Sequence, residues 1–304
     1  MRDLKLKTIL KDTWTASRPL SLTLAIYSTT LGISIAHLEG KLFAAGSSSL
    51  RIDILKIALV TAAGILVQTG TNLINDYFEC GLKFKDFKGK KYKFLGKMRT
   101  DFDIYIFMLG MACFGATALI GLILVYLSTP KLIAVGIIGI IGGYSYTGEP
   151  IVYKRLGLGA ILSFVLMGPL MVFGSYLVLA ESFSWSPILL GLPVSLMIPL
   201  LMFSNELRDY QRDKDMKIRT LTVRLGFVNG KRIFLILLCS PYFLTLIFIF
   251  YRFIPLSALL VFVTLPLAIK SYRNAATAKK EGVPITNKLH LSFGLIYISS
   301  MLLM

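Results

Sequence analysis

The stretch Asn205–Gly226 reads NELRDYQRDKDMKIRTLTVRLG, a dense cluster of charge that directly follows a long uncharged apolar segment. Asp209 and Asp213 are four residues apart, so in a continuing helix their carboxylates share one face and could hold a divalent cation. The surrounding basic side chains favour a site for a metal and the polyanion that accompanies it, such as magnesium diphosphate. The alternative is a solvated, charged helix end. The basic residues are Arg208, Arg212, Lys214, Lys217, Arg219 and Arg224.

The composition indicates a membrane protein. Of the 304 residues, 55% are hydrophobic and only 16% are charged, which is too apolar for a soluble domain of this length. Basic residues outnumber acidic ones by 33 to 16, a balance that in a soluble protein would suggest nucleic acid binding. The sequence contains no nucleic-acid-binding motif, and the lipid bilayer is therefore the expected partner.

Nine apolar segments approach or exceed the length needed to cross a hydrocarbon core of about 30 Å. They predict an all-α integral membrane protein, a bundle of about nine transmembrane helices in a single domain over residues 1–304. Residues 1–18 alternate between basic and apolar and are expected to lie on the membrane surface, with no secretory cleavage pattern after them. The apolar segments are 19–38, 54–78, 102–128, 131–147, 157–180, 187–207, 232–251, 254–269 and 288–304.

The distribution of basic residues supports this count of segments. If the chain crosses the membrane at each segment, 28 of the 33 Lys and Arg residues fall on the side of the N-terminus and five on the other side. Cytoplasmic loops of membrane proteins carry such an excess of basic residues. We therefore expect a multi-pass protein of the cell membrane whose N-terminus and charged loops face the cytoplasm.

A second acidic cluster ends another apolar segment. Residues 70–86 read GTNLINDYFECGLKFKD, in which Asn72, Asn75 and Glu79 follow a spacing of three or four, and Asn72 and Asp76 are four apart. Mg²⁺ prefers such oxygen ligands, takes few protein carboxylates and binds substrate phosphate as well. Acids near membrane depth are costly and are retained for a function or for a partner within the bundle. The location of both clusters on one predicted side favours a shared site.

A third polar stretch, YSYTGEPIVYKRLGLG at residues 144–159, is predicted on the same side. Tyr146 can donate a hydrogen bond and Lys154 can reach an anion held by the two acidic clusters. Topological anchoring by Lys154 and Arg155 explains the basic pair equally well, and Arg18 before Pro19 allows the same two interpretations.

Cys80, Cys113 and Cys239 show no metal-ligand spacing. His37 and His290 are isolated and are expected at the membrane interface rather than as ligands.

These motifs together resemble the UbiA-type intramembrane aromatic prenyltransferases. The resemblance rests on NDYFE after an apolar helix, on YTGEPIVYKRLGLG and on NELRD followed by RTLTVRLG, and it extends over roughly residues 14–300. Within the family, YTGEP, the later GPLMVFGSYLV and RTLTVRLG look most like the 1,4-dihydroxy-2-naphthoate prenyltransferases of menaquinone synthesis. The resemblance implies a UbiA-like helical bundle that binds a polyprenyl diphosphate through Mg²⁺, with a lipid-facing tunnel for the isoprenoid tail.

The resemblance also implies a role for each matching residue. It makes Asp76, Glu79, Asp209 and Asp213 the catalytic and metal-binding acids. Asp86 is a further candidate, offset from the usual position, and no general base is indicated. The implied diphosphate contacts are Asn72, Asn75, Arg18, Tyr146, Lys154 and Arg208.

The expected reaction is Mg²⁺-dependent transfer of a prenyl chain to an aromatic acceptor, 1,4-dihydroxy-2-naphthoate by the resemblance. Other acceptors, such as 4-hydroxybenzoate or a glyceryl phosphate, stay open at this point. A transporter that binds ions with the same acids is a second class of function. The location of both clusters at one face, away from the membrane midplane, argues against a transporter. The sequence does not define the oligomeric state or the length of the prenyl chain.

Overall fold

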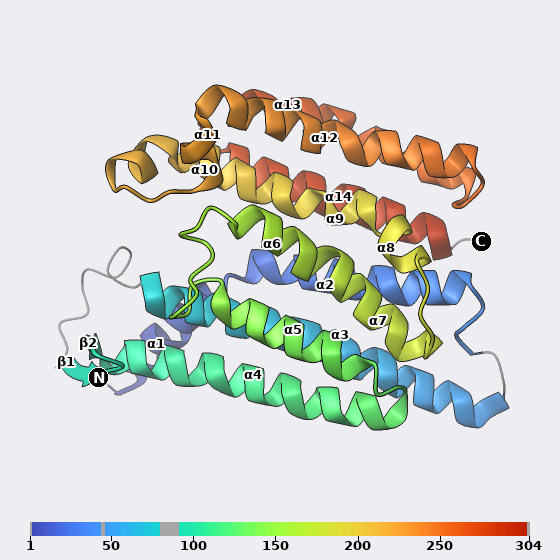
Figure 1. The fold of residues 1–304 in the computed structure, drawn as a ribbon, viewed down its shortest axis with the longest axis horizontal. Helices are drawn as coiled ribbons and strands as arrows, with labels where there is room; N and C mark the ends of the chain where they lie inside the picture. The colour runs from blue at the N-terminus through green and yellow to red at the C-terminus, as the bar shows by residue number, and fades with distance from the viewer. Residues whose placement is uncertain (1, 44–45, 80–90, 303–304) are drawn as a thin grey trace.

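The computed structural model describes residues 2–43, 46–79 and 91–302, in which long helices run side by side along the molecule (Figure 1). The first half contains α1 (Arg2–Ser17), α2 (Pro19–Leu38), α3 (Gly46–Glu79), β1 (Lys91–Phe94), β2 (Lys97–Thr100), α4 (Asp101–Leu127) and α5 (Leu132–Ser145). The second half contains α6 (Gly159–Val165), η1 (Leu166–Leu170), α7 (Met171–Ala180), α8 (Ser186–Leu190), α9 (Leu192–Ser195), α10 (Met197–Asp215), α11 (Leu221–Leu225), α12 (Phe227–Phe250), η2 (Leu256–Thr264), α13 (Leu265–Ala275) and α14 (Gly282–Leu302).

The predicted fold class is confirmed, because all nine apolar segments fall on helices of one bundle. The count of nine membrane crossings stays a prediction. By length and composition, five stretches of the described chain can cross a membrane, and the shorter α5 is also apolar. These stretches are Pro19–Leu38, Asp101–Leu127, Gly159–Ala180, Phe227–Phe250 and Leu256–Ala275.

One of these stretches is interrupted in the middle. Between α6 and α7 the backbone of Gly168 leaves the helical region, with φ −92° and ψ −106°, and Pro169 follows it. Proline has no N–H to donate and clashes with the preceding turn, so a kink forms at this point. Leu166 and Met167 lie in the interrupted turn and line the cavity described below.

The core depends on close contact between α2 and α7. A Cβ atom on Gly32 would lie 2.2 Å from the backbone oxygen of Val172, so only glycine permits this approach. Leu31, Ile35 and Tyr176 are almost completely buried around it. This packing fixes the N-terminal helices against the middle of the chain, and the cavity lies between these helices and α10.

The prediction for His290 was wrong. Its side chain is 1% exposed inside the bundle, and its ring meets that of Tyr27 edge-on with 5.4 Å between ring centroids. His37, near the end of α2, is exposed. A single histidine in an apolar helix gives no sequence signal for which face of that helix is buried.

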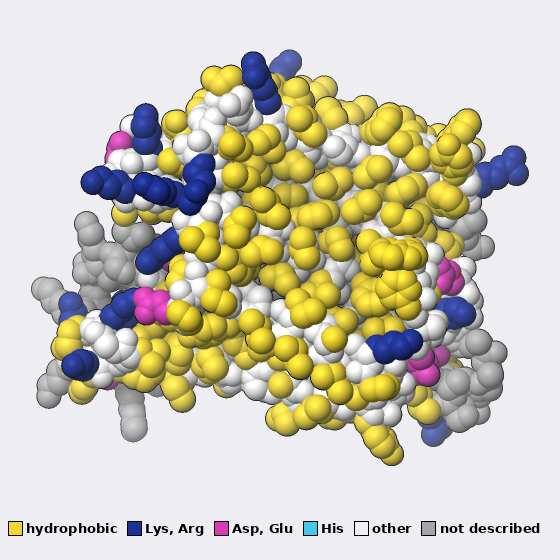
Figure 2. Space-filling model, viewed as in Figure 1, with side chains coloured by type: hydrophobic (Ala, Val, Ile, Leu, Met, Phe, Trp, Pro, Cys, Tyr) yellow, Lys and Arg dark blue, Asp and Glu magenta, His cyan; other side chains and the backbone are white. Residues whose placement is uncertain are grey.

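The surface in Figure 2 divides into an apolar middle and charged ends. Hydrophobic side chains cover the middle of the helices, while Lys, Arg, Asp and Glu side chains gather at both ends of the molecule. Because a bilayer replaces water around the middle of a membrane protein, this pattern fits helices that lie across a membrane.

The basic segment before α4 contains a small hairpin that the sequence did not predict. Strands β1 and β2 pair antiparallel, with Lys91 opposite Thr100 and Phe94 opposite Lys97. Lys97 forms an ion pair with Glu149, from the YTGEP loop. The hairpin is therefore attached to the loop that carries Tyr146 and Lys154.

Candidate active site

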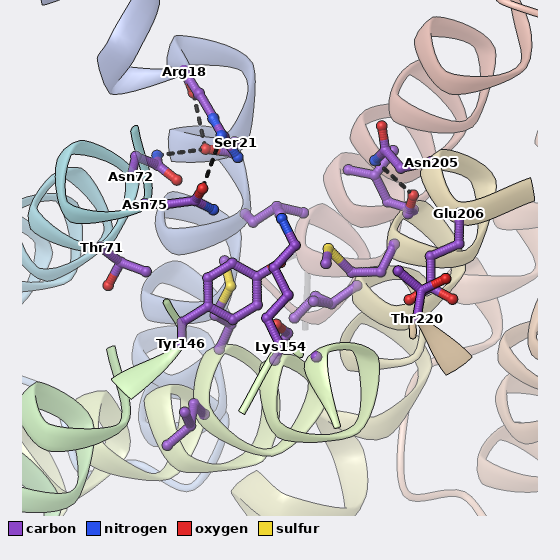
Figure 3. A pocket seen from close by; sticks show the side chains of 18 of the residues that line it. Arg18, Ser21, Thr71, Asn72, Asn75, Tyr146, Lys154, Asn205, Glu206 and Thr220 are labelled. Atoms are coloured by element: carbon purple, nitrogen blue, oxygen red, sulfur yellow. Dashed lines mark hydrogen bonds between the residues drawn. The ribbon is translucent and has the colours of Figure 1, made fainter. Parts of the chain in front are cut away.

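A cavity of about 710 Å³ lies at the end of the bundle where α3, α5 and α10 meet the loop after α5. Its polar side chains come from distant parts of the sequence and converge from several directions (Figure 3). Nine of the ten predicted site residues line it: Arg18, Asn72, Asn75, Glu79, Tyr146, Lys154, Arg208, Asp209 and Asp213. The tenth, Asp76, does not, and Asp86 lies outside the described residues.

The first wall of the cavity is the last part of α3. Asn72 donates from its amide nitrogen to the backbone oxygen of Ser17 at 2.8 Å and to the hydroxyl of Ser21 at 2.7 Å. Asn75 accepts a hydrogen bond of 3.2 Å from the guanidinium of Arg18. These bonds attach α3 to the junction between α1 and α2 and place the Arg18 side chain toward the cavity (Figure 3).

The helical spacing explains the position of Asp76. Asn72, Asn75 and Glu79 form a narrow stripe along α3, and Asp76 lies one step further around the helix. It is buried, with 6% of its surface exposed, and it makes contacts within the protein. Asp76 therefore lies beside this stripe on α3 and is not among the residues that line the cavity.

The junction at Arg18 has an uncommon backbone conformation. Arg18 takes φ 49° and ψ 66°, in the left-handed region, between the end of α1 and Pro19 at the start of α2. A side chain with a Cβ atom adopts this region only at a cost, and such strain is often stored at functional sites. The turn directs the Arg18 guanidinium toward Glu79, 3.7 Å away.

The second wall is the loop after α5. The backbone N–H groups of Tyr153 and Lys154 donate to the oxygens of Ser145 and Tyr146, both at 3.1 Å. The Lys154 ammonium forms an ion pair with Glu79 and lies 5.5 Å from the ring centre of Tyr146. Burial lowers the pKa of Lys154, but Tyr146 and Glu79 outweigh burial and the pKa is raised, so the ammonium stays charged.

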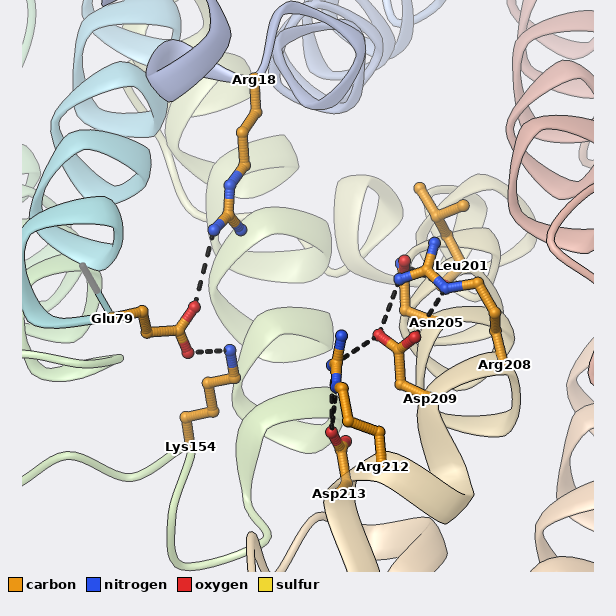
Figure 4. Close-up of polar contacts among 9 residues, drawn as sticks. All are labelled: Arg18, Glu79, Lys154, Leu201, Asn205, Arg208, Asp209, Arg212 and Asp213. Carbon is orange, nitrogen blue, oxygen red and sulfur yellow. Dashed lines mark hydrogen bonds and ion pairs between the residues drawn. The ribbon is translucent and has the colours of Figure 1, made fainter. Parts of the chain in front are cut away.

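The third wall is the charged end of α10 (Figure 4). The Arg208 guanidinium binds Asp209 with two bonds of 2.8 and 2.7 Å. Arg212 bridges both acids, with one nitrogen 2.9 Å from Asp209 and 3.0 Å from Asp213. Burial raises the pKa of Asp209, but Arg208 and Arg212 outweigh it and the pKa is lowered, while burial dominates at Asp213 and raises its pKa. Two acids one turn apart thus differ in their environment.

The acids of the first and third walls fit a metal that also binds a substrate. Within residues 2–43, 46–79 and 91–302, no three Asp, Glu, His or Cys side chains are grouped closely enough to hold a metal by themselves. Mg²⁺ usually takes one or two carboxylates and completes its shell with water and phosphate oxygens. Asp209 and Asp213 on one wall and Glu79 on the other offer such oxygens, and amide oxygens adjoin them. The donor set therefore fits Mg²⁺ that arrives with an anion.

The deeper part of the cavity is apolar. Gly139 and Gly143 lie one turn apart on α5, and a Cβ atom on Gly143 would lie 2.6 Å from the Thr71 hydroxyl. A Cβ atom on Gly139 would meet no atom within 4 Å, so the cavity is open beside it. The apolar side chains that line this part are Leu24, Val67, Leu166, Met167, Met171, Ile198, Leu201 and Met202.

Several lining residues were missed by the sequence reasoning. Glu206 lies three residues before Asp209, and this helical spacing could have placed it on the same face. Ser21, Gln68 and Thr220 carry no pattern of their own and become neighbours only through the fold. Tyr144, the first residue of the YSYTGEP stretch, is not among the lining residues, and its ring meets Phe78 edge-on.

Comparison with known proteins identifies the family of this chain and the solved structures that share its fold. A profile of the UbiA prenyltransferase family matches residues 107–290. The UbiA prenyltransferase domain-containing protein 1 of Danio rerio is 28% identical over 95% of this chain and 83% of its own length. The 1,4-dihydroxy-2-naphthoate octaprenyltransferase of Bacillus subtilis is 26% identical over 70% of this chain and 65% of its own length.

Solved structures share the fold. An apo UbiA homologue from Aeropyrum pernix covers 92% of this chain and 97% of its own with a TM-score of 0.66 at 14% identity. A UbiA homologue from Archaeoglobus fulgidus bound to GPP and Mg²⁺ covers 94% of this chain and 99% of its own, with a TM-score of 0.58 at 12% identity. The family profile spans more than half of the chain, and the chain belongs to the UbiA prenyltransferase family.

Proposed function

We propose that this protein transfers a prenyl chain from a polyprenyl diphosphate to an aromatic acceptor, with Mg²⁺ as cofactor. The observation that carries the proposal is a cavity that acids, bases and apolar side chains line together. A prenyl diphosphate has the same division, because its anionic head needs cations and its tail needs apolar surface. The Archaeoglobus homologues bound to GPP or DMAPP together with Mg²⁺ support this class of donor.

The basic residues bind the diphosphate in this proposal. Arg18 and Lys154 approach from one side of the cavity and Arg208 and Arg212 from the other. In the described structure each is paired with an acid, so an incoming diphosphate exchanges these partners for its own oxygens. Asn72, Asn75 and Tyr146 add hydrogen bonds.

The acids hold the cofactor. Asp209 and Asp213 on α10, with Glu79 and the adjoining Asp76 on α3, supply the carboxylates. When bound, Mg²⁺ supplies positive charge against the diphosphate oxygens as the allylic C–O bond breaks. Arg208 and Arg212 stabilise the same negative charge in the transition state.

The acceptor assigned by the proposal is 1,4-dihydroxy-2-naphthoate. The bonding electrons of the allylic C–O bond leave with the diphosphate, and the ring carbon that carries the carboxylate forms the new C–C bond. The carboxylate then leaves as CO₂ and returns its bonding electrons to the ring. The Bacillus relative and the likeness of the YTGEP and RTLTVRLG motifs support this acceptor. An apolar cavity wall excludes water, which would otherwise capture the allylic cation.

The test uses purified protein in lipid, Mg²⁺, a prenyl diphosphate and three acceptors offered in parallel. These are 1,4-dihydroxy-2-naphthoate, 4-hydroxybenzoate and a glyceryl phosphate, and mass spectrometry separates the products. We expect a prenylated, decarboxylated naphthalene diol. Product from another acceptor alone would keep the reaction class and overturn the acceptor. Absence of every product, together with ion flux in vesicles, would favour a transporter.

A further inference from the structure

Glu206 is the one described acid lining the cavity that lacks a basic partner. Glu79, Asp209 and Asp213 each form an ion pair with Lys or Arg, whereas no described Lys or Arg forms one with Glu206. One oxygen of its carboxylate accepts a hydrogen bond of 2.8 Å from the backbone N–H of Thr222. This bond anchors the carboxylate to the start of α11, and Glu206 also lines the cavity.

Thr220 provides a second polar group at the same place. It lines the cavity, lies two residues before Thr222, and is 6% exposed. Within the described part of the chain its hydroxyl has no hydrogen-bond partner. A buried hydroxyl without a partner is costly, so one that lines a cavity points to a group that binds there.

The charge of this pair disfavours the diphosphate head as its ligand. Figure 3 shows Glu206 and Thr220 across the cavity from Arg18, Asn72 and Asn75. A carboxylate that forms no ion pair with Lys or Arg repels an anion and attracts a hydrogen-bond donor. The pair therefore suits a neutral group that both donates and accepts.

We propose that Glu206 and Thr220 bind a free hydroxyl group of the aromatic acceptor. This inference rests on the prenyl transfer proposed above and adds the chemical class of acceptor. The acceptor hydroxyl donates to the second oxygen of Glu206 and accepts from the hydroxyl of Thr220. The pair selects aromatic compounds with a free hydroxyl at this position against their methyl ethers, and it keeps any carboxylate of the acceptor away from Glu206.

The substitution Glu206→Gln tests the proposal with little change in shape. Only the amide oxygen of glutamine can accept from the Thr222 N–H, so the NH₂ group faces the cavity and replaces an acceptor by a donor. We expect the KM for 1,4-dihydroxy-2-naphthoate to rise about 10- to 100-fold, the range for loss of a hydrogen bond to a charged group. The affinity for prenyl diphosphate with Mg²⁺ should stay unchanged. Glu281→Gln, an exposed acid outside the cavity, is the matched control.

The two monomethyl ethers of the acceptor identify the hydroxyl that is bound. In the wild type one ether should have a KM at least about tenfold above that of the parent diol. In Glu206→Gln this ether and the parent diol should have about the same KM, because the contact that distinguishes them is already lost. A wild-type KM in Glu206→Gln, or an equal penalty for both ethers in both proteins, would overturn the inference.

The substitution Thr220→Val provides a second test, which does not depend on whether Glu206→Gln folds. It removes an unpartnered hydroxyl, so heat unfolding should occur at the wild-type temperature or above, while the KM for the acceptor rises about 3- to 10-fold. An unchanged KM for the acceptor in this variant would contradict the proposal that Thr220 binds the acceptor hydroxyl. Failure of the wild type to prenylate any acceptor is a different outcome, which overturns the proposed function and this inference with it.

Discussion

The Arg212 guanidinium on α10 bridges Asp209 and Asp213, at 2.9 Å and 3.0 Å from their carboxylate oxygens. The bridge balances two acids that would otherwise repel each other across one helical turn. It also marks the place where a cation is needed. In the proposed function Asp209 and Asp213 would hold Mg²⁺ once the diphosphate pairs with Arg212, and the metal would supply the positive charge that balances them.

The first prediction concerns these acids. Asp209→Asn and Asp76→Asn should each lower kcat at least about 100-fold, because each removes a carboxylate proposed to hold the Mg²⁺ that stabilises the leaving diphosphate. Since the ion pairs of Asp209 are partly exposed, its loss should change the free energy of unfolding by no more than about 1 kcal/mol. Turnover at saturating Mg²⁺ and heat unfolding measure the two effects. Full activity in Asp209→Asn, or turnover that survives chelation of divalent metal, would contradict the site.

The second prediction separates the two basic residues of the YKR sequence. Lys154 lines the cavity beside Glu79, while the adjacent Arg155 is exposed. Lys154→Gln should raise the KM for prenyl diphosphate about tenfold or more, because a charged contact with the anion is lost. Arg155→Gln should leave KM and kcat within about twofold of the wild type, as expected of an exposed surface change. If Lys154→Gln also left KM and kcat within about twofold of the wild type, both residues would serve only to orient the chain in the membrane.

The third prediction concerns the apolar part of the cavity. A Cβ atom on Gly139 would meet no atom within 4 Å, and this residue lines the cavity, so Gly139→Leu should narrow the cavity there. Long prenyl diphosphates should then react more slowly while short ones keep their rate. Gly136, one turn earlier on α5, also has free space but does not line the cavity, so Gly136→Leu is the control. A competition between donors of different chain length, read by mass, measures the ratio. The same ratio of long-chain to short-chain product in both variants would show that the prenyl tail does not bind beside Gly139.

The fourth prediction is the topology. Reporter labels near Lys91, Lys154, Lys214 and Lys279 should all be cytoplasmic, because basic loops stay on that side. In Figure 1 the β hairpin and the connection from α10 to α11 lie at one end of the bundle and the connection from α7 to α8 lies at the other. A label near Trp185 should therefore be external. If labels of the first group were found on opposite sides of the membrane, the walls of the cavity could not meet in one site.

The sequence was sufficient for the helices and for most of the cavity. Long apolar segments specify helices in a bilayer regardless of their neighbours, and a charged motif at a helix end has few alternatives. The kink at Gly168 and Pro169 was not predicted, since an apolar stretch keeps its composition whether or not its helix is broken. The hairpin at 91–100 was missed because its strands are too short and too polar to show an apolar alternation.

Glu206 and Thr220 show the limit of sequence reasoning more clearly. The sequence places Glu206 in a charged run where an acid without a basic partner looks like any other acid. Its separate environment arises because α11 turns back and offers the N–H of Thr222. The unpartnered hydroxyl of Thr220 is likewise a property of packing, which has no local signature.

The division of the cavity into a charged end and an apolar depth has a consequence for the products of the proposed reaction. Diphosphate is soluble in water and leaves through the charged end, where Arg208 and Arg212 are partly exposed. The prenylated ring is oily, and its tail already lies among the apolar helices when the bond forms. The two products enter different phases, so recombination at the same site is disfavoured, and the lipid product reaches the bilayer without crossing water.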